Sequence, residues 1–70
     1  MKWFAYGMLR ELVPFSYPAD YVAYKDFGYV RQVDDKCEVR LILWYEHKLT
    51  KAQMLYYELI KLKDYDLKFR

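Results

Sequence analysis

The chain offers one histidine and one cysteine for chemistry, and neither has the neighbours that catalysis or metal binding needs. His47 lies between a predicted strand and a predicted helix, with no second metal ligand at helical spacing. Cys37 precedes it by ten residues, and an extended strand would hold the two roughly 30 Å apart. We therefore expect no Cys–His nucleophilic pair. Cys37 is predicted to be a small core residue and His47 to lie in a solvated loop.

The aspartates do not indicate a catalytic site either. Asp34 and Asp35 fall in a predicted turn, and Asp64 and Asp66 flank a predicted strand. Paired carboxylates catalyse when burial and mutual repulsion move their pKa values apart, whereas carboxylates in turns are normally exposed. We predict no catalytic residue, no metal site and no cofactor, and we interpret the chain as a non-enzyme.

One segment resembles an enzyme family. The run Phe4-Ala5-Tyr6-Gly7-Met8-Leu9-Arg10 is similar to the opening strand and loop of gamma-glutamylcyclotransferase-like proteins, in which a Y-G-[ST]-L pattern precedes a substrate-binding loop. Met8 stands where that pattern has a small hydroxyl residue, and the chain is too short for the family's barrel and downstream catalytic glutamate. The resemblance covers seven of 70 residues and would place an enzymatic role on the Tyr6-Gly7 loop.

The composition bounds the class of protein. A chain of 70 residues is predicted to form a single compact domain, residues 1–70, which buries only about 60% of its extended-chain surface. One cysteine cannot form an internal disulfide, so a core rich in aromatic residues (21% of the chain), association with a partner, or both must supply stability. The lone cysteine favours a cytoplasmic location. No apolar run approaches the roughly 18 residues of a membrane span, so we expect no membrane partner.

The clearest predicted element is a helix from Lys51 to Lys63. Thr50 and Gln53 are spaced as a capping box, and Leu49 before the cap could pack against Met54. Helical periodicity predicts a core face made of several apolar residues. These residues are Ala52, Leu55, Tyr56, Leu59, Ile60 and Leu62.

The rest of the chain favours an antiparallel sheet. Residues 37–46 alternate with period 2 and contain β-branched and aromatic residues, which is typical of a strand. We also predict strands over 2–9, 29–33 and 64–70. Residues 21–25 favour a further strand that turns at Asp26-Phe27-Gly28, and a short helix over 18–27 is the alternative. The predicted fold is α+β: a small antiparallel meander of about four or five strands with one amphipathic C-terminal helix packed on one face.

Two features predict a contact surface. On the helix, Met54, Tyr57, Glu58 and Lys61 form a stripe at i, i+3, i+4 and i+7 beside the predicted core face. On the strand, Ile42 and Trp44 make one end apolar on both sides. One helix is not expected to cover both faces of the sheet. Unless the N-terminal segment does so, these residues would remain available to a partner. The predicted partner-binding residues are Met54, Tyr57, Lys61, Trp44 and Ile42.

We therefore interpret the chain as a non-enzymatic protein–protein interaction module that binds a larger protein, itself as a homodimer, or both. Its size and aromatic composition are similar to those of small bacteriophage accessory proteins, many of which bind and inhibit host or defence proteins. The alternative is a single-stranded nucleic-acid (RNA or ssDNA) binder that uses sheet aromatics and a basic C-terminal region. A net charge of only +2 makes this the weaker hypothesis. Its predicted residues are Tyr29, Arg31, Lys68, Phe69 and Arg70.

Overall fold

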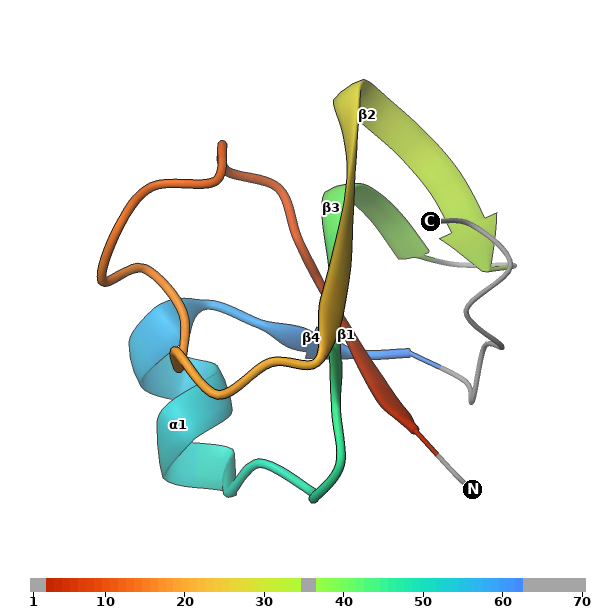
Figure 1. Cartoon of the computed structure of the whole chain (residues 1–70). Helices are drawn as coiled ribbons and strands as arrows, with labels where there is room; N and C mark the ends of the chain where they lie inside the picture. The colour runs from red at the N-terminus through yellow and green to blue at the C-terminus, as the bar shows by residue number, and fades with distance from the viewer. Residues whose placement is uncertain (1–2, 35–36, 63–70) are drawn as a thin grey trace.

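A computed structural model describes residues 3–34 and 37–62, and within them the chain forms a four-stranded antiparallel sheet with one short helix (Figure 1). This confirms the predicted α+β class. The strand order in the sheet is β2-β3-β1-β4. The elements are β1 (Phe4–Met8), β2 (Ala23–Asp34), β3 (Cys37–Tyr45), α1 (Lys51–Tyr57) and β4 (Ile60–Lys61).

The sheet departs from a simple meander because the N-terminal strand lies in its interior. β1 pairs with β3 on one side, where Tyr6 faces Leu43, and with β4 on the other, where Tyr6 faces Lys61. Only β2 and β3 are joined as consecutive neighbours. The chain after α1 therefore has to return to β1, which determines where the helix ends.

β2 is one long strand where the sequence predicted two strands and a turn. The turn chemistry at 26–28 is present, since the Asp26 side chain accepts a 2.9 Å hydrogen bond from the Gly28 amide and Gly28 has a φ of 77°. It produces an irregularity within the strand, between the pairs Asp26–Leu41 and Arg31–Val39. Residues from Ala23 onward are strand, as preferred over the helical alternative.

The irregular β2–β3 hairpin closes the second face of the sheet. Leu41, Leu43 and Tyr45 of β3 belong to one core cluster, whereas Val39 joins Ile42 and Trp44 in another. The alternation of side chains is thus interrupted between Val39 and Leu41. Val39 comes so close to β1 that a Cβ on Gly7 would lie 2.3 Å from the Val39 Cγ1 atom.

The two core clusters lie on opposite faces, and the expectation that the second face stays open was wrong. Ile42 and Trp44 are completely buried. The bent hairpin brings Phe27 and Val33 against them, and Trp3 and Leu62 pack in the same cluster, so neither side chain reaches the surface. The first cluster is Tyr6, Met8, Leu41, Leu43, Tyr45, Leu49 and Leu59, with Phe4, Leu12, Tyr17, Tyr21, Met54 and Tyr57 packed against it.

The start of α1 is as predicted. The Gln53 amide donates to Thr50 Oγ1 at 3.1 Å, and the Thr50 amide donates to Gln53 Oε1 at 2.9 Å, which completes the capping box. Leu49 and Met54 share the first core cluster.

The end of α1 differs from the prediction, because the helix stops at Tyr57 and not at Lys63. Glu58 adopts the left-handed conformation (φ 58°, ψ 45°), and the Leu59 amide closes the turn on the Met54 carbonyl at 2.8 Å. The chain then extends into β4, and the Leu62 amide donates to the Ala5 carbonyl at 3.0 Å. No glycine or proline marks the end of the helix at this position. Helical periodicity alone therefore predicted a helix that continues past Tyr57.

In the structure, the buried and exposed sides of α1 are the reverse of those predicted. Leu55 and Tyr56, expected in the core, are 82% and 78% exposed. Met54 and Tyr57, expected on the surface stripe, pack against the first core cluster. Leu59 and Leu62 are buried as expected, although they follow the helix and do not belong to it. The predicted strand over 64–70 lies outside the described residues.

Candidate functional site

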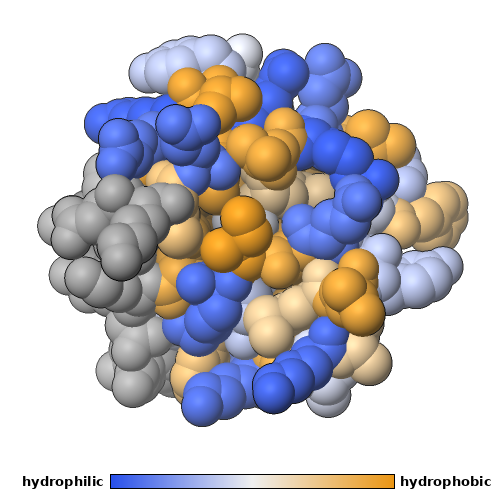
Figure 2. All heavy atoms as spheres, turned by 180° about the vertical axis from the view of Figure 1, so that it is seen from behind, coloured by the Kyte–Doolittle hydropathy of each residue, from blue (hydrophilic) through white to orange (hydrophobic). Residues whose placement is uncertain are grey.

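The outer side of α1 joins the ends of β1 and β4 in one exposed apolar surface. We name it the α1 surface and define it by Leu9, Leu55, Tyr56 and Ile60. Leu9 is 53% and Ile60 39% exposed. Ile60 lines one hollow with Leu55 and a second with Leu9, and Tyr56 follows Leu55 on the helix. Figure 2, which views the molecule from behind, shows apolar side chains gathered in the middle of this face with hydrophilic ones around them.

The α1 surface is hollowed into a groove. A hollow of about 400 Å³ is lined by Lys51, Met54, Leu55, Glu58, Leu59 and Ile60. A second hollow of about 330 Å³ is lined by Leu9, Arg10, Glu58 and Ile60. The two hollows share Glu58 and Ile60 as lining residues, and we name the pair of them the α1 groove. Its lining is mostly apolar and includes the charged residues Lys51, Arg10 and Glu58, a composition suited to holding an apolar side chain.

Charged contacts hold the rim of the groove in place. The Arg10 Nε atom lies 3.1 Å from the Glu58 carboxylate, and Arg10 Nη2 donates to the Tyr57 carbonyl at 3.3 Å. Arg10 thereby ties the end of β1 to the end of α1. Lys51 lies in the first turn of the helix, at the other end of the groove.

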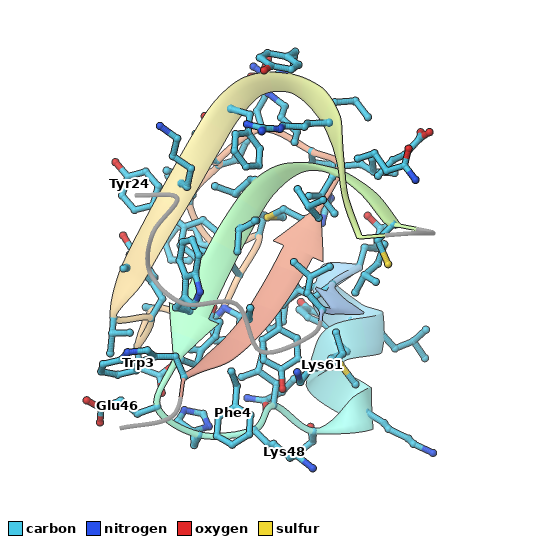
Figure 3. The ribbon with its side chains drawn as sticks, turned by 90° about the vertical axis from the view of Figure 1, so that its right-hand side faces the viewer. Trp3, Phe4, Tyr24, Glu46, Lys48 and Lys61 are labelled. Carbon is cyan, nitrogen blue, oxygen red and sulfur yellow. The ribbon has the colours of Figure 1, made fainter. Side chains whose placement is uncertain are left out.

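The five predicted partner-binding residues are separated by the fold. Met54 and Tyr57 face the first core cluster, and Ile42 and Trp44 are buried in the second. Only Lys61 is exposed: its ammonium lies 5.9 Å from the centre of the Phe4 ring (Figure 3). Three of the four residues that define the α1 surface, Leu55, Tyr56 and Ile60, were predicted as core. The pairing of Leu49 with Met54 was the one sequence signal that placed Met54 inward.

The residues predicted for nucleic acid are not assembled into a site by the described part of the chain. Tyr29 and Arg31 are exposed on β2, and the Arg31 guanidinium lies 5.0 Å from the centre of the Phe27 ring. Lys68, Phe69 and Arg70 lie outside the described residues.

His47 is in an exposed loop, as predicted, but it has a partner that the sequence did not reveal. Its Nε2 atom lies 2.6 Å from the Asp20 carboxylate and its Nδ1 atom 3.2 Å from the Lys48 carbonyl. The hydrogen bond to Asp20, followed by that to the backbone, raises the pKa of His47 above its ordinary value of 6.5. Both ring nitrogens thus face acceptors, which favours the charged imidazolium over a free base or metal ligand.

The His47–Asp20 pair lies over a buried anchor of the same loop. The Tyr45 hydroxyl donates to the Pro18 carbonyl at 2.8 Å, and burial raises the pKa of Tyr45. These contacts fasten the segment between β1 and β2 to the sheet. Among residues 3–34 and 37–62, no three His, Cys, Asp or Glu side chains gather as a metal site would require.

Cys37 is partly buried against the second core cluster, at the opposite end of β3 from His47. No helix within the described ranges is long and apolar enough to cross a membrane. Comparison of the chain with protein-family models, with curated proteins and with solved structures finds no match.

Proposed function

We propose that this chain is a non-enzymatic protein–protein interaction module and that the α1 surface is its contact site. The observation that carries the proposal is a pair of adjacent, highly exposed apolar residues: Leu55, which lines the α1 groove, and Tyr56, which follows it on the helix. Single exposed apolar residues are ordinary, but a contiguous apolar patch with a charged rim is typical of a binding surface.

Tyr56 has the properties of an anchor for such a contact. Its ring meets that of Tyr57 edge to face, with the ring centres 4.8 Å apart. Tyr57 itself packs against the first core cluster. The exposed ring is therefore oriented before a partner arrives, and pre-organised aromatic side chains lose little entropy on binding. Aromatic anchors of this kind are frequent among the residues that dominate binding energy.

The role we propose is steric occlusion. A small domain that covers a functional surface of another protein inhibits it without chemistry of its own. The similarity in size and composition to bacteriophage accessory proteins supports a host or defence protein as the target. Lys51 at one end of the α1 groove would favour a partner whose matching face is acidic.

Photo-crosslinking tests the proposal. A photoreactive phenylalanine analogue replaces Tyr56 in the full chain, and the same analogue at Tyr29, also exposed but on β2, is the matched control. In lysate of the source cells, we expect an adduct of defined mass from position 56 and none from position 29. Excess unmodified chain should suppress it, and excess Leu55→Glu chain should not. Adducts only at position 29, or at neither position, would contradict the proposal.

Nucleic-acid binding is the alternative outcome. A labelled single-stranded oligonucleotide, titrated at low and at physiological salt, would bind with a steep salt dependence if phosphate contacts dominated. Loss of that binding in Tyr29→Ala, with binding retained in Tyr56→Ala, would transfer the function to β2.

A further inference from the structure

The connection between β1 and β2, residues 9–22, lies across the first core cluster, and we name it the strap. Leu12, Tyr17 and Tyr21 pack against that cluster. The tip between them projects into solvent: Phe15 is 93% exposed, and its φ of 68° lies in the left-handed region that a Cβ disfavours. Because the tip is not packed, each half of the strap depends on its own contacts with the rest of the fold.

The first half of the strap is fastened by arginines. The Nη1 atom of Arg40 lies 3.4 Å from the Glu11 carboxylate, and the Nε atom of Arg10 lies 3.1 Å from the Glu58 carboxylate. Arginine keeps its charge throughout the pH range in which histidine titrates. The arginines therefore stay charged when the pH changes around neutrality.

The second half of the strap, residues 16–22, is fastened to the end of β3. The Val22 amide donates to the Trp44 carbonyl at 2.7 Å, and the Tyr45 hydroxyl donates to the Pro18 carbonyl at 2.8 Å. Burial raises the pKa of Tyr45, so its hydroxyl keeps its proton around neutrality. These two hydrogen bonds do not titrate there either.

The remaining contact of the second half does titrate. The Nε2 atom of His47 lies 2.6 Å from the Asp20 carboxylate, and its Nδ1 atom lies 3.2 Å from the Lys48 carbonyl. Both oxygens can only accept, so only the imidazolium can donate to both. The hydrogen bonds to Asp20 and to the Lys48 carbonyl, with a smaller effect of the Glu46 charge, raise the pKa of His47. The groups that face the ring are Asp20 from the strap, Glu46 and Lys48 beside it in its loop (Figure 3), and Tyr45 of β3, whose ring centre is 6.0 Å away.

We propose that the His47–Asp20 pair is a pH-sensitive latch: protonated His47 holds residues 16–22 against the first core cluster, and loss of its proton lets them open locally. Opening exposes Tyr17 and Tyr21, whose rings meet edge to face on the cluster with their centres 5.6 Å apart. The latch is a property of the strap and does not depend on the α1 surface.

The direction of the pH effect follows from the two states of the strap. The closed strap presents Asp20 to the ring, so it binds the His47 proton more tightly than the open strap does. The latch is at full strength below the pKa of the open form, near 6.5, and is lost as pH rises through the higher pKa of the closed form. Both side chains are more than half exposed, and an exposed ion pair changes the opening equilibrium by about two- to fivefold.

Hydrogen exchange of the full chain, followed by NMR, tests the latch at the Val22 amide. Its protection factor, which corrects for the intrinsic effect of pH on exchange, should fall by about two- to fivefold between about pH 5.5 and about pH 8.5. Asp20→Asn and His47→Gln should lower the protection at the acidic end and abolish its dependence on pH. Glu11→Gln, the matched control, breaks the contact with Arg40 at the other half of the strap and should keep the pH dependence.

The dependence on urea separates local opening from global unfolding. A local opening exposes little surface, so Val22 exchange should respond less to low concentrations of urea than exchange of the β1 amides, and its protection should be lower. Equal protection and equal urea dependence at Val22 and in β1 would overturn the latch, because the strap would then open only with the whole fold. A protection factor at Val22 that does not change with pH, or a change that persists in both Asp20→Asn and His47→Gln, would also overturn it.

Discussion

The two sides of α1 carry the same kinds of side chain, but one side is packed against the core and the other is exposed. The inner side, Met54 and Tyr57, packs against the first core cluster, and the outer side, Leu55 and Tyr56, faces solvent beside a groove. Each side has one flexible or branched apolar residue and one tyrosine. The composition of a seven-residue helix therefore does not determine which side is buried. The difference comes from the chain on either side of the helix, Leu49 before it and Leu59 after it, both of which are buried.

The strongest test of this contrast is a matched pair of tyrosine substitutions. Tyr57→Ala should lower the free energy of unfolding by about 2–3 kcal/mol, because it removes a ring packed on the core. Tyr56→Ala should change it by only about 0.5 kcal/mol or less, because the ring is exposed. Denaturant titration measures both values. Equal losses would mean that the two sides of the helix are not distinguished by the fold.

Removal of the cap should cost less and act on both sides together. Thr50→Ala loses the hydroxyl that accepts from the Gln53 amide, and we expect a loss of about 1 kcal/mol. Because the helix positions both its inner and outer residues, the same variant should weaken binding at the α1 surface by a comparable factor. Hydrogen exchange of the α1 amides, compared between variant and parent, locates the effect. Protection lost across the whole sheet and spared in α1 would contradict it.

Substitution of Glu58 tests the role of its left-handed conformation at the C-terminal end of α1. Glu58 holds a left-handed conformation that glycine adopts without strain, so Glu58→Gly should stabilise the fold by about 0.5 kcal/mol after the exposed ion pair with Arg10 is lost. Glu58→Gln keeps the Cβ while removing the charge, and it isolates the ion-pair contribution. If Glu58→Gly destabilised the fold more than Glu58→Gln, the conformational explanation would be wrong.

The smallest effect is expected at His47, outside the helix. Its folded-state pKa is raised above 6.5, so the pair with Asp20 stabilises the fold below the unfolded-state pKa and is lost as pH rises through the folded-state value. The difference in melting temperature between wild type and His47→Gln should be larger at about pH 6 than at about pH 9. An NMR titration of the imidazole should give a midpoint above 6.5 that falls in Asp20→Asn. A midpoint unmoved by Asp20→Asn would contradict this assignment.

Local chemistry along the chain was sufficient for several elements. Period-2 alternation predicted β3 to within a residue, and Thr50 with Gln53 predicted the first residue of α1. The turn residues Asp26 and Gly28 were recognised, although they bend a continuous strand and do not separate two. These features depend on neighbours a few residues apart, and a sequence shows such neighbours directly.

The candidate site could not be predicted in the same way. Tyr56 was assigned to the core and Tyr57 to the surface because helical periodicity was continued past Glu58, where nothing in the residue types marks an end. The groove requires Leu9, which follows β1, to line one hollow with Ile60 of β4, and about fifty positions separate these two residues. Phe15 lies in a proline-containing connection and has a positive φ, a backbone conformation that phenylalanine disfavours and that its residue type therefore did not predict.

Residue types and short spacings thus determined the class of fold, the helix start and the excess of aromatic residues over what one small core needs. Only the tertiary structure decided which aromatic residues are buried in the core and which are exposed. The insertion of β1 between β3 and β4 requires the chain to leave the helix early, and the bent β2–β3 hairpin buries Trp44. The physical reason is that burial is a property of the whole packing arrangement: a long-range strand pairing outweighs the weak preference of any one helix face.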